Sequence, residues 1–211
     1  MNCTTYELLV LRNGWTKPLD EHTFSSACTI SLLLGQKRIL VDPGGPWDTD
    51  MLRSLLHQRN IEISSIDYVI CTHEHVDHMG SLCLFPDATQ IVGTTLSTRG
   101  AIHHNFCTDK PYEIDSNIKI VYTPGHADCD ISVVVLNVHS YGRVAIAGDI
   151  FECEEDLKSP ELWRTSSANT RIQQFSREKL INEADFIVPG HGPLFKVPED
   201  GKQLLLSVHG T

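Results

Sequence analysis

A short histidine-rich run limits the folds open to this chain more than any other segment. His73, His75, Asp77 and His78 lie within six residues, directly after the apolar stretch 66–71. Imidazole and carboxylate groups held this close together are unfavourable unless a cation or hydrogen bonds compensate them. The fold must therefore bring an apolar strand to a turn that binds a cation.

The spacing divides the run into two pairs. Because extended residues alternate between faces, His73 and His75 project together from the end of the strand. Asp77 and His78 then fall on the first turn of a helix that is expected to continue to Cys83. A helical His-Glu-x-x-His zinc-protease motif is excluded, because Asp77 stands where that motif needs a second histidine. The two pairs should point at neighbouring positions.

Strand-like and helix-like segments alternate along the chain, which indicates the α/β fold class. The expected strands are 5–12, 28–34, 38–41, 66–71, 90–93, 118–122, 132–138, 143–147 and 185–188. The expected helices are 48–59, a helix with Pro160 at its first position, and 167–184. We expect a single domain over 1–211, built from two halves of roughly 1–110 and 111–211 that share a core.

Three further candidate ligands stand at equivalent places in the chain. His126, Asp149 and His191 each follow an apolar strand at a turn marked by glycine. An α/β fold gathers its reactive groups at strand ends, so these three loops should converge on the histidine-rich run. A single histidine in a turn is usually a surface residue. The combination with the run favours one shared site.

Charge and apolar content limit the partners. The formal net charge is −10, whereas broad affinity for nucleic acid depends mainly on clustered Lys and Arg. A local basic site stays open. Apolar runs are all shorter than the roughly 18–20 residues that a membrane span needs, so we expect no membrane partner.

The N-terminus and the cysteines predict an intracellular protein. No basic segment followed by an apolar core and a cleavage site opens the chain, so secretion is not expected. The seven cysteines are an odd number without a Cys-x-x-Cys pair, which favours neither a disulfide framework nor a thiolate zinc site. A reducing compartment, the cytoplasm or the nucleus, fits this pattern.

The set of motifs resembles the metallo-β-lactamase superfamily. Each motif is a turn that contains Asp or His, and the motifs follow one another along the chain in the same order as in that family. They lie at 41–44, 72–78, 123–126, 147–149 and 189–192. The resemblance spans most of the chain. It implies a four-layer αββα sandwich with a binuclear metal centre at the edge between two sheets.

The resemblance also implies a role for each ligand. His73, His75 and His126 would bind the first metal, Asp77, His78 and His191 the second, and Asp149 would bridge both. Members that hydrolyse antibiotics with a cysteine ligand lack this aspartate bridge, so thioesters, phosphodiesters or lactones are the expected substrates. Imidazole and carboxylate ligands suit two divalent ions, zinc first, with iron or manganese also compatible.

The expected reaction is hydrolysis by a metal-bound hydroxide. A metal lowers the pKa of bound water to about 7, so the catalytic role left for a side chain is orientation of the attacking water, which Asp77 could supply. The segments between the motifs resemble a small intracellular group of the superfamily associated with endonucleolytic cleavage at the 3′ end of histone pre-mRNA. This resemblance implies an RNA phosphodiesterase.

Other functions stay open. A glyoxalase II-like thioesterase is one alternative and a non-catalytic metal-dependent binding module is another, while a mononuclear iron dioxygenase fits less well. The partners are accordingly RNA or a small thioester, and a homodimer is compatible with the sequence. Substrate recognition is expected in 94–114 and 153–168. His103 and His104 are candidates for the substrate mouth, and Trp15 for a cover over the site.

Two residues near the ligands carry alternative interpretations. Asp42, in a Pro-Gly-Gly turn after a strand, either forms an Asx-type turn or orients a ligand histidine. Glu74 either alters contacts around the ligands or is a solvated side chain. Both alternatives stay open at the level of sequence.

Overall fold

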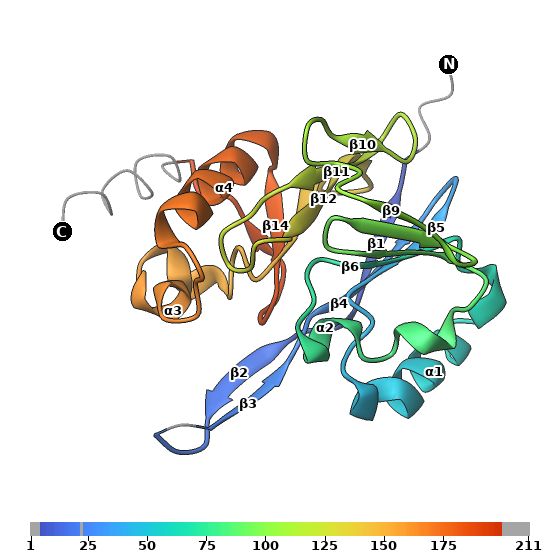
Figure 1. Cartoon of the computed structure of the whole chain (residues 1–211), viewed down its shortest axis with the longest axis horizontal. Helices are drawn as coiled ribbons and strands as arrows, with labels where there is room; N and C mark the ends of the chain where they lie inside the picture. Colours follow the sequence, from blue (N-terminus) through green and yellow to red (C-terminus); the bar gives the residue numbers. More distant parts are fainter. Residues whose placement is uncertain (1–4, 22, 200–211) are drawn as a thin grey trace.

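The protein is a layered structure in which two β-sheets face each other and helices cover their outer faces (Figure 1). It is a computed structural model that describes residues 5–21 and 23–199. Cys3, His22 and His209 lie outside these residues. The arrangement confirms the expected four-layer α/β sandwich.

The first sheet has seven strands in the order β1-β4-β5-β6-β7-β8-β9. They are β1 (Glu7–Arg12), β4 (Ile30–Leu34), β5 (Arg38–Val41), β6 (Tyr68–Cys71), β7 (Thr89–Val92), β8 (Thr95–Thr98) and β9 (Ala101–His104). Strands β5, β6 and β7 run parallel, and the remaining neighbours are antiparallel. Helix α1 (Thr49–His57) connects β5 to β6.

The second sheet has six strands in the order β10-β11-β12-β13-β14-β15. They are β10 (Tyr112–Glu113), β11 (Ile118–Tyr122), β12 (Ile131–Val138), β13 (Gly142–Gly148), β14 (Phe186–Pro189) and β15 (Phe195–Lys196). Only β13 and β14 pair in parallel among these strands. Their connection contains α3 (Glu161–Arg164) and α4 (Thr170–Glu183).

A two-stranded hairpin and several short helices complete the described residues. The hairpin pairs β2 (Trp15–Pro18) with β3 (Phe24–Ala27) and projects from the body at the bottom of Figure 1. The short helices are η1 (Pro46–Asp48), η2 (Ile63–Ser65), α2 (Val76–Met79), η3 (Leu82–Leu84) and η4 (Glu154–Leu157). Helix α3 starts one residue later than expected, because Pro160 is its N-cap.

The alternation of side chains along each strand produces the layers. Ile39 and Val41 of β5 share a buried cluster with Val133 and Val135 of β12, so this core fills the space between the sheets. The residues between them, such as Leu40, point to the opposite face. Burial on both faces explains why the central strands are almost wholly apolar.

The outer cores join each sheet to its helices. Leu40 packs with Leu52 and Leu56 of α1. On the other side of the molecule, Val134 packs with Leu180 of α4. Each of these two helices therefore covers the outer face of one sheet.

The helix after the histidine-rich run is shorter than predicted. It was expected to reach Cys83, but α2 ends at Met79 and η3 forms a separate turn. Ser81 donates its N–H to the Gly44 carbonyl and its hydroxyl to the Gly45 carbonyl instead of continuing the helical hydrogen bonds. These contacts come from a distant turn, which local spacing does not encode.

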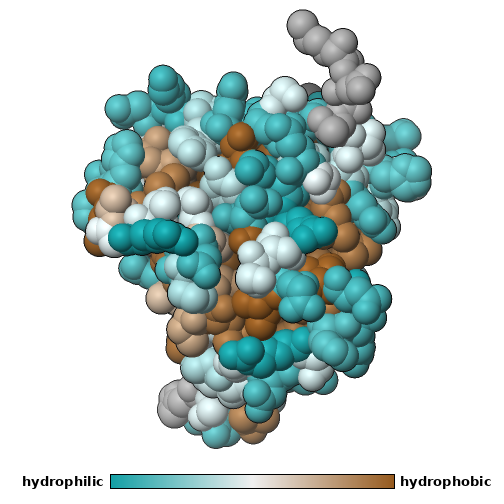
Figure 2. Space-filling view, turned by 90° about the vertical axis from the view of Figure 1, so that its right-hand side faces the viewer, coloured by the Kyte–Doolittle hydropathy of each residue, from teal (hydrophilic) through white to brown (hydrophobic). Residues whose placement is uncertain are grey.

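The surface combines polar and apolar regions. In Figure 2, hydrophobic residues gather mainly around the middle of the face shown, between more hydrophilic regions above and below. The large exposed hydrophobic side chains include Leu19 and Phe24, next to the tip of the hairpin. None of the described helices has the length and apolar content that crossing a bilayer requires.

Candidate metal centre

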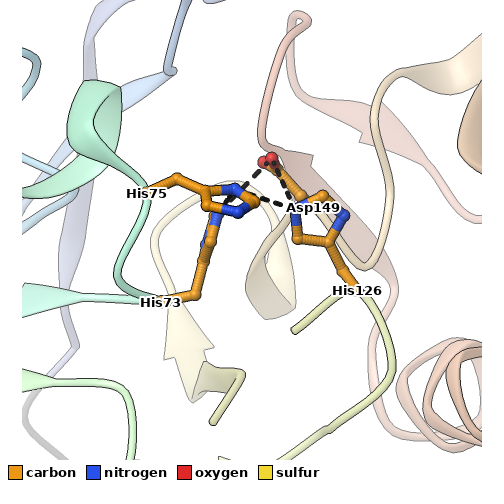
Figure 3. Close-up of side chains that lie close together, drawn as sticks. All are labelled: His73, His75, His126 and Asp149. Atoms are coloured by element: carbon orange, nitrogen blue, oxygen red, sulfur yellow. Dashed lines mark hydrogen bonds and ion pairs between the residues drawn. The ribbon is translucent and has the colours of Figure 1, made fainter. Parts of the chain in front are cut away.

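The predicted ligands lie at one edge of the two sheets. The histidine-rich run follows β6, His126 follows β11, Asp149 follows β13 and His191 follows β14. Strand β11 is antiparallel to β12, and β12 is antiparallel to β13, so β11, β13 and β14 all end at the same edge. In Figure 3, His73 and His75 extend toward the site from one side, and His126 and Asp149 extend toward it from the other. The structure brings all seven predicted ligand residues together.

The first group of ligand atoms is compact. The Nδ1 atom of His75 lies 2.9 Å from Nε2 of His73 and 3.1 Å from Nε2 of His126. The Oδ2 atom of Asp149 lies 3.5 Å and 3.4 Å from the same two Nε2 atoms. Three imidazoles and one carboxylate, with all four ligand atoms within 4.8 Å of one another, are able to hold a metal ion.

A second group lies on the other side of the same carboxylate. The Nε2 atoms of His78 and His191 are each 3.9 Å from Oδ2 of Asp77. They are each 3.2 Å from an oxygen of Asp149, His78 from Oδ1 and His191 from Oδ2. Asp149 therefore touches histidines of both groups, as the bridging role requires.

The opposite ring nitrogens of these histidines have partners that orient the rings. Nδ1 of His78 lies 3.1 Å from Oδ2 of Asp42, a carboxylate that also accepts the Thr72 N–H at 2.7 Å. Nδ1 of His191 lies 3.1 Å from the Ala27 carbonyl. These contacts, a hydrogen bond at His191 and a close ion-pair contact at His78, orient the rings and leave Nε2 free for a ligand. The structure favours the orienting role of Asp42.

Burial and charge perturb the site strongly. Burial lowers the pKa of His126 to about 4 and places that of His73 well below its usual value. Burial also opposes the protonation of His191 and His78, but Asp149 outweighs it and raises the pKa of His191 to about 9 and that of His78 well above the usual range. The buried carboxylate of Asp149 thus favours the protonated form of these two imidazoles.

A further observation, independent of these distances, also supports a pair of metal ions at this site. Oδ1 of Asp149 and both ring nitrogens of His78 are buried and have no properly aligned hydrogen-bond partner among the described residues. Buried polar atoms in folded proteins are almost always satisfied. A cation between Oδ1 and Nε2 would satisfy both of these atoms, so the cluster is suited to metal ions.

Side chains of α4 hold the loop that follows Asp149 in place through hydrogen bonds. The fully buried Arg177 donates to both oxygens of Asp156 at 2.6 Å and 3.0 Å, and to the Ile150 carbonyl at 2.7 Å. Gln173 donates to the Asp149 carbonyl at 2.9 Å. These contacts fix the backbone that carries the bridging carboxylate.

Sequence reasoning missed one acidic group in the site. Glu152 is half-buried next to Asp149 and His191, with Oε1 3.9 Å from Nδ1 of His126. Burial raises its pKa to about 8, and the nearby Asp149 acts in the same direction. Its position three residues after Asp149 was the available signal. Glu74, in contrast, is exposed, as the solvated interpretation predicts.

A cavity of about 480 Å³ opens beside the second group of ligands. Its lining comes from the hairpin, from the segment 152–153, from Glu161 and Leu162 of α3, from the segment 165–166, and from His191. The predicted recognition segment 153–168 thus contributes to it, but 94–114 does not, because β8 and β9 are the outermost strands of their sheet. His103, His104 and Trp15 are also absent from its lining, and Phe24 stands there instead.

Comparison with known proteins agrees with this geometry. Residues 26–108 match the model of the metallo-β-lactamase superfamily. The chain is 37% identical to metallo-β-lactamase domain-containing protein 1 of Xenopus laevis over 196 residues, which are 92% of this chain and 82% of that protein. The chain therefore belongs to the metallo-β-lactamase superfamily, whose members are mostly metal-dependent hydrolases.

Solved structures show the same fold at lower identity. A quorum-quenching N-acyl homoserine lactone lactonase aligns with a TM-score of 0.66 and 19% identity, covering 90% of this chain and 93% of that one. A variant metallo-β-lactamase from Cronobacter sakazakii aligns with a TM-score of 0.59 and 14% identity, covering 92% and 94%. These similarities establish the fold, and function must be argued from the site.

Proposed function

We propose that this protein is a hydrolase that uses two divalent metal ions. The observation that carries the proposal is the Asp149 carboxylate, whose two oxygens lie 3.2 Å from Nε2 of His78 and of His191 and within 3.5 Å of His73 and His126. A carboxylate placed between two sets of imidazoles is suited to bridging. Bound divalent ions would supply Lewis-acid polarisation of a substrate oxygen and acidify water at neutral pH.

The side chains of the site would divide the remaining work. His73, His75 and His126 would hold one ion, and His78 and His191 with Asp77 the other. Asp77 accepts a hydrogen bond from the Ser26 hydroxyl at 3.1 Å, which fixes its carboxylate at the edge of the second group. A fixed carboxylate there could both bind metal and orient a water molecule.

Two substrate classes follow from different observations. The resemblance of the segments between the motifs favours an RNA phosphodiester. The cavity beside His191, which contains no Lys or Arg among its lining residues, favours an uncharged ester or thioester. A single experiment can test both substrate classes.

The test is a substrate screen on protein whose metal content has been measured. We expect two divalent ions per chain, zinc being the first candidate, and turnover of either a single-stranded RNA or a panel of esters, lactones and thioesters. Asp149→Asn and His75→Ala should abolish that turnover, whereas Asp67→Asn, at a carboxylate paired with Lys37 away from the site, should not. A single iron would contradict the two-metal arrangement. Full metal loading without turnover on any substrate would contradict the hydrolase and favour a binding module.

A further inference from the structure

A second cavity lies on the outer side of the first sheet, between α1 and η3. Its volume is about 480 Å³, within the range of roughly 300–1,000 Å³ that is usual for cavities that bind small molecules. Its lining comes from α1, from the connection between α1 and β6, and from the turn that joins η3 to β7. The described residues that line it include none of the seven predicted metal ligands. In Figure 1, α1 lies at the lower right, whereas α3 and α4 lie at the left.

The floor of this cavity is apolar and firmly held. Ile66, Phe85 and Ala88 are buried there and belong to the core between the first sheet and α1. The Ile66 N–H donates to the Ile63 carbonyl at 3.2 Å, and the Ala88 N–H donates to the Phe85 carbonyl at 3.3 Å. The Gln90 side chain donates to the same Phe85 carbonyl at 3.0 Å. These bonds fix the walls, so an occupant would not have to order them on binding.

Two side chains with unused donors stand on the rim. Arg53 and His57 are four residues apart on α1, so they project from the same side of the helix. Both are exposed, and neither side chain has a hydrogen-bond or ion-pair partner among the described residues. Arg59, in contrast, donates to the Leu55 carbonyl at 3.0 Å. Arg53 and His57 are thus both able to donate to an anion.

Two carboxylates on the same rim limit the charge of an occupant. Asp87 already has a cation beside it, because its Oδ1 atom lies 3.1 Å from Nη2 of Arg99. Glu62 is exposed and has no such cation among the described residues. Several negative charges in the cavity would be repelled by Glu62 and would exceed what Arg53 and His57 can balance. A single carboxylate matches the available donors.

We propose that this cavity binds a small carboxylate with an aromatic or branched apolar body. The carboxylate accepts hydrogen bonds from the planar guanidinium of Arg53, which is suited to a bidentate contact, and from the His57 ring. The apolar body covers the floor formed by Ile66, Phe85 and Ala88, where it is removed from water. This binding site is separate from the candidate metal centre, so its function goes beyond the proposed hydrolase and does not depend on it.

Titration followed by nuclear magnetic resonance locates the ligand directly. Phenylbutyrate would be added to the isotope-labelled, metal-loaded full chain while the amide signals of 61–66 and 84–88 are followed. We expect saturable shifts in both segments. Phenylbutyramide has the same apolar body without the charge and should bind roughly tenfold more weakly, because it lacks the charge-assisted hydrogen bonds. Shifts found only beside the metal ligands would show that the carboxylate binds metal instead, and would overturn the proposed site.

Exposed arginines on two helices supply a matched pair of variants. Arg53→Gln should weaken the binding of phenylbutyrate roughly tenfold and remove the preference for the acid over the amide. Arg171 on α4 is also exposed and has no side-chain partner among the described residues. Arg171→Gln therefore changes the net charge by the same amount at a distant place and should leave the dissociation constant unchanged. Equal losses in the two variants would indicate a general effect of charge and contradict a contact at Arg53.

The apolar part of the site is tested by a conservative change. Ile63→Val removes one methylene from the lining and should weaken the acid and the amide alike, by up to roughly fourfold. Ile172→Val, at an exposed position on α4, is the control and should change neither.

The result can overturn the cavity without affecting the hydrolase. No saturable shift in 61–66 or 84–88 up to the solubility limit of phenylbutyrate would rule out the site. Equal binding of acid and amide would rule out recognition of the carboxylate. Metal-dependent turnover is measured separately, and its loss or presence has no bearing on these shifts.

Discussion

Gly190 shows how closely the backbone approaches the bridging carboxylate. A Cβ atom at this position would overlap Oδ1 of Asp149. The backbone of this turn is also tied to the neighbouring loop, since Gly190 N–H donates to the Phe151 carbonyl at 2.9 Å. Neither partner can move away without disturbing the other, so glycine is required here for steric reasons.

Replacement of this glycine should therefore damage the site more than the fold. We expect Gly190→Ala to displace the Asp149 carboxylate and weaken metal binding by at least tenfold, measured by competition with a chelator, while the far-ultraviolet circular dichroism stays unchanged. Gly192→Ala in the same turn is the matched control, because its Cβ would meet nothing nearer than 3.1 Å. Equal metal affinity in Gly190→Ala and the unchanged protein would contradict this prediction.

Asp42 adopts a positive φ of 53° while its carboxylate contacts Thr72 and His78. Asparagine tolerates this backbone conformation, so Asp42→Asn removes the charge with little added strain. We expect a loss of roughly 10–100-fold in affinity for the second metal, because Nδ1 of His78 would face a neutral amide in place of the carboxylate that orients the ring. Equilibrium dialysis of both metals measures this effect. Asp67→Asn provides the control for removal of a carboxylate, and equal losses in the two variants would rule out the orienting role.

At the scale of elements, α4 supports the site although it carries no ligand. Arg177 lies over the rings of Phe151 and Trp163, at 4.1 Å and 4.8 Å from their centroids, and pairs with Asp156. Asp156 in turn accepts the Glu152 N–H at 2.8 Å. The helix, the connecting segment and the loop after β13 are thus joined by one buried charged network.

Removal of the arginine should be costly because it leaves a buried carboxylate unpaired. We expect Arg177→Met to lower the free energy of unfolding by about 3–5 kcal/mol. The control is Arg143→Met, whose pair with the half-exposed Asp185 is open to solvent and contributes about 1 kcal/mol or less. Urea denaturation of both variants measures the difference. Similar losses would indicate that the buried network has no special role.

At the scale of the whole molecule, two independent sheets bring carboxylates and imidazoles to a single edge. When metal is removed, the stability that these groups give the folded protein depends on pH. The pKa of His191 is raised to about 9, and those of Glu152 and Asp130 are raised to about 8, in the latter two cases by burial first. A group whose pKa is raised on folding binds its proton more tightly in the folded state. The free energy of unfolding therefore falls as the pH rises from the unfolded-state pKa through the folded-state pKa.

Chelator-treated protein should therefore become less stable between pH 6.5 and about 9. The pKa of His191 moves from 6.5 to about 9 on folding, which defines this window. The lowered pKa of His126, about 4, acts in the opposite direction but only below pH 6.5. Metal ions replace the protons, so metal-loaded protein should lose less stability over the same range. Thermal unfolding of both forms checks this, and parallel curves would contradict it.

Much of the fold could be predicted because its signals are local. Strands β5 and β11 have the predicted bounds 38–41 and 118–122, since runs of apolar and β-branched residues end there at turns. The early end of α2 could not be predicted, because Ser81 bonds to carbonyls at Gly44 and Gly45. Glu152 was missed for a related reason, since its neighbour His191 lies far along the chain.

The sequence by itself determined the fold class, the family and the set of residues able to bind metal, because periodicity, turn glycines and ligand types are properties of short segments. Tertiary structure alone decided how these segments meet. Ser26 and His191 lie 165 residues apart in the chain and 3.3 Å apart in space. The cavity joining the hairpin to α3 depends on the same kind of contact. Such contacts depend on the packing of whole sheets and helices, which no local pattern specifies.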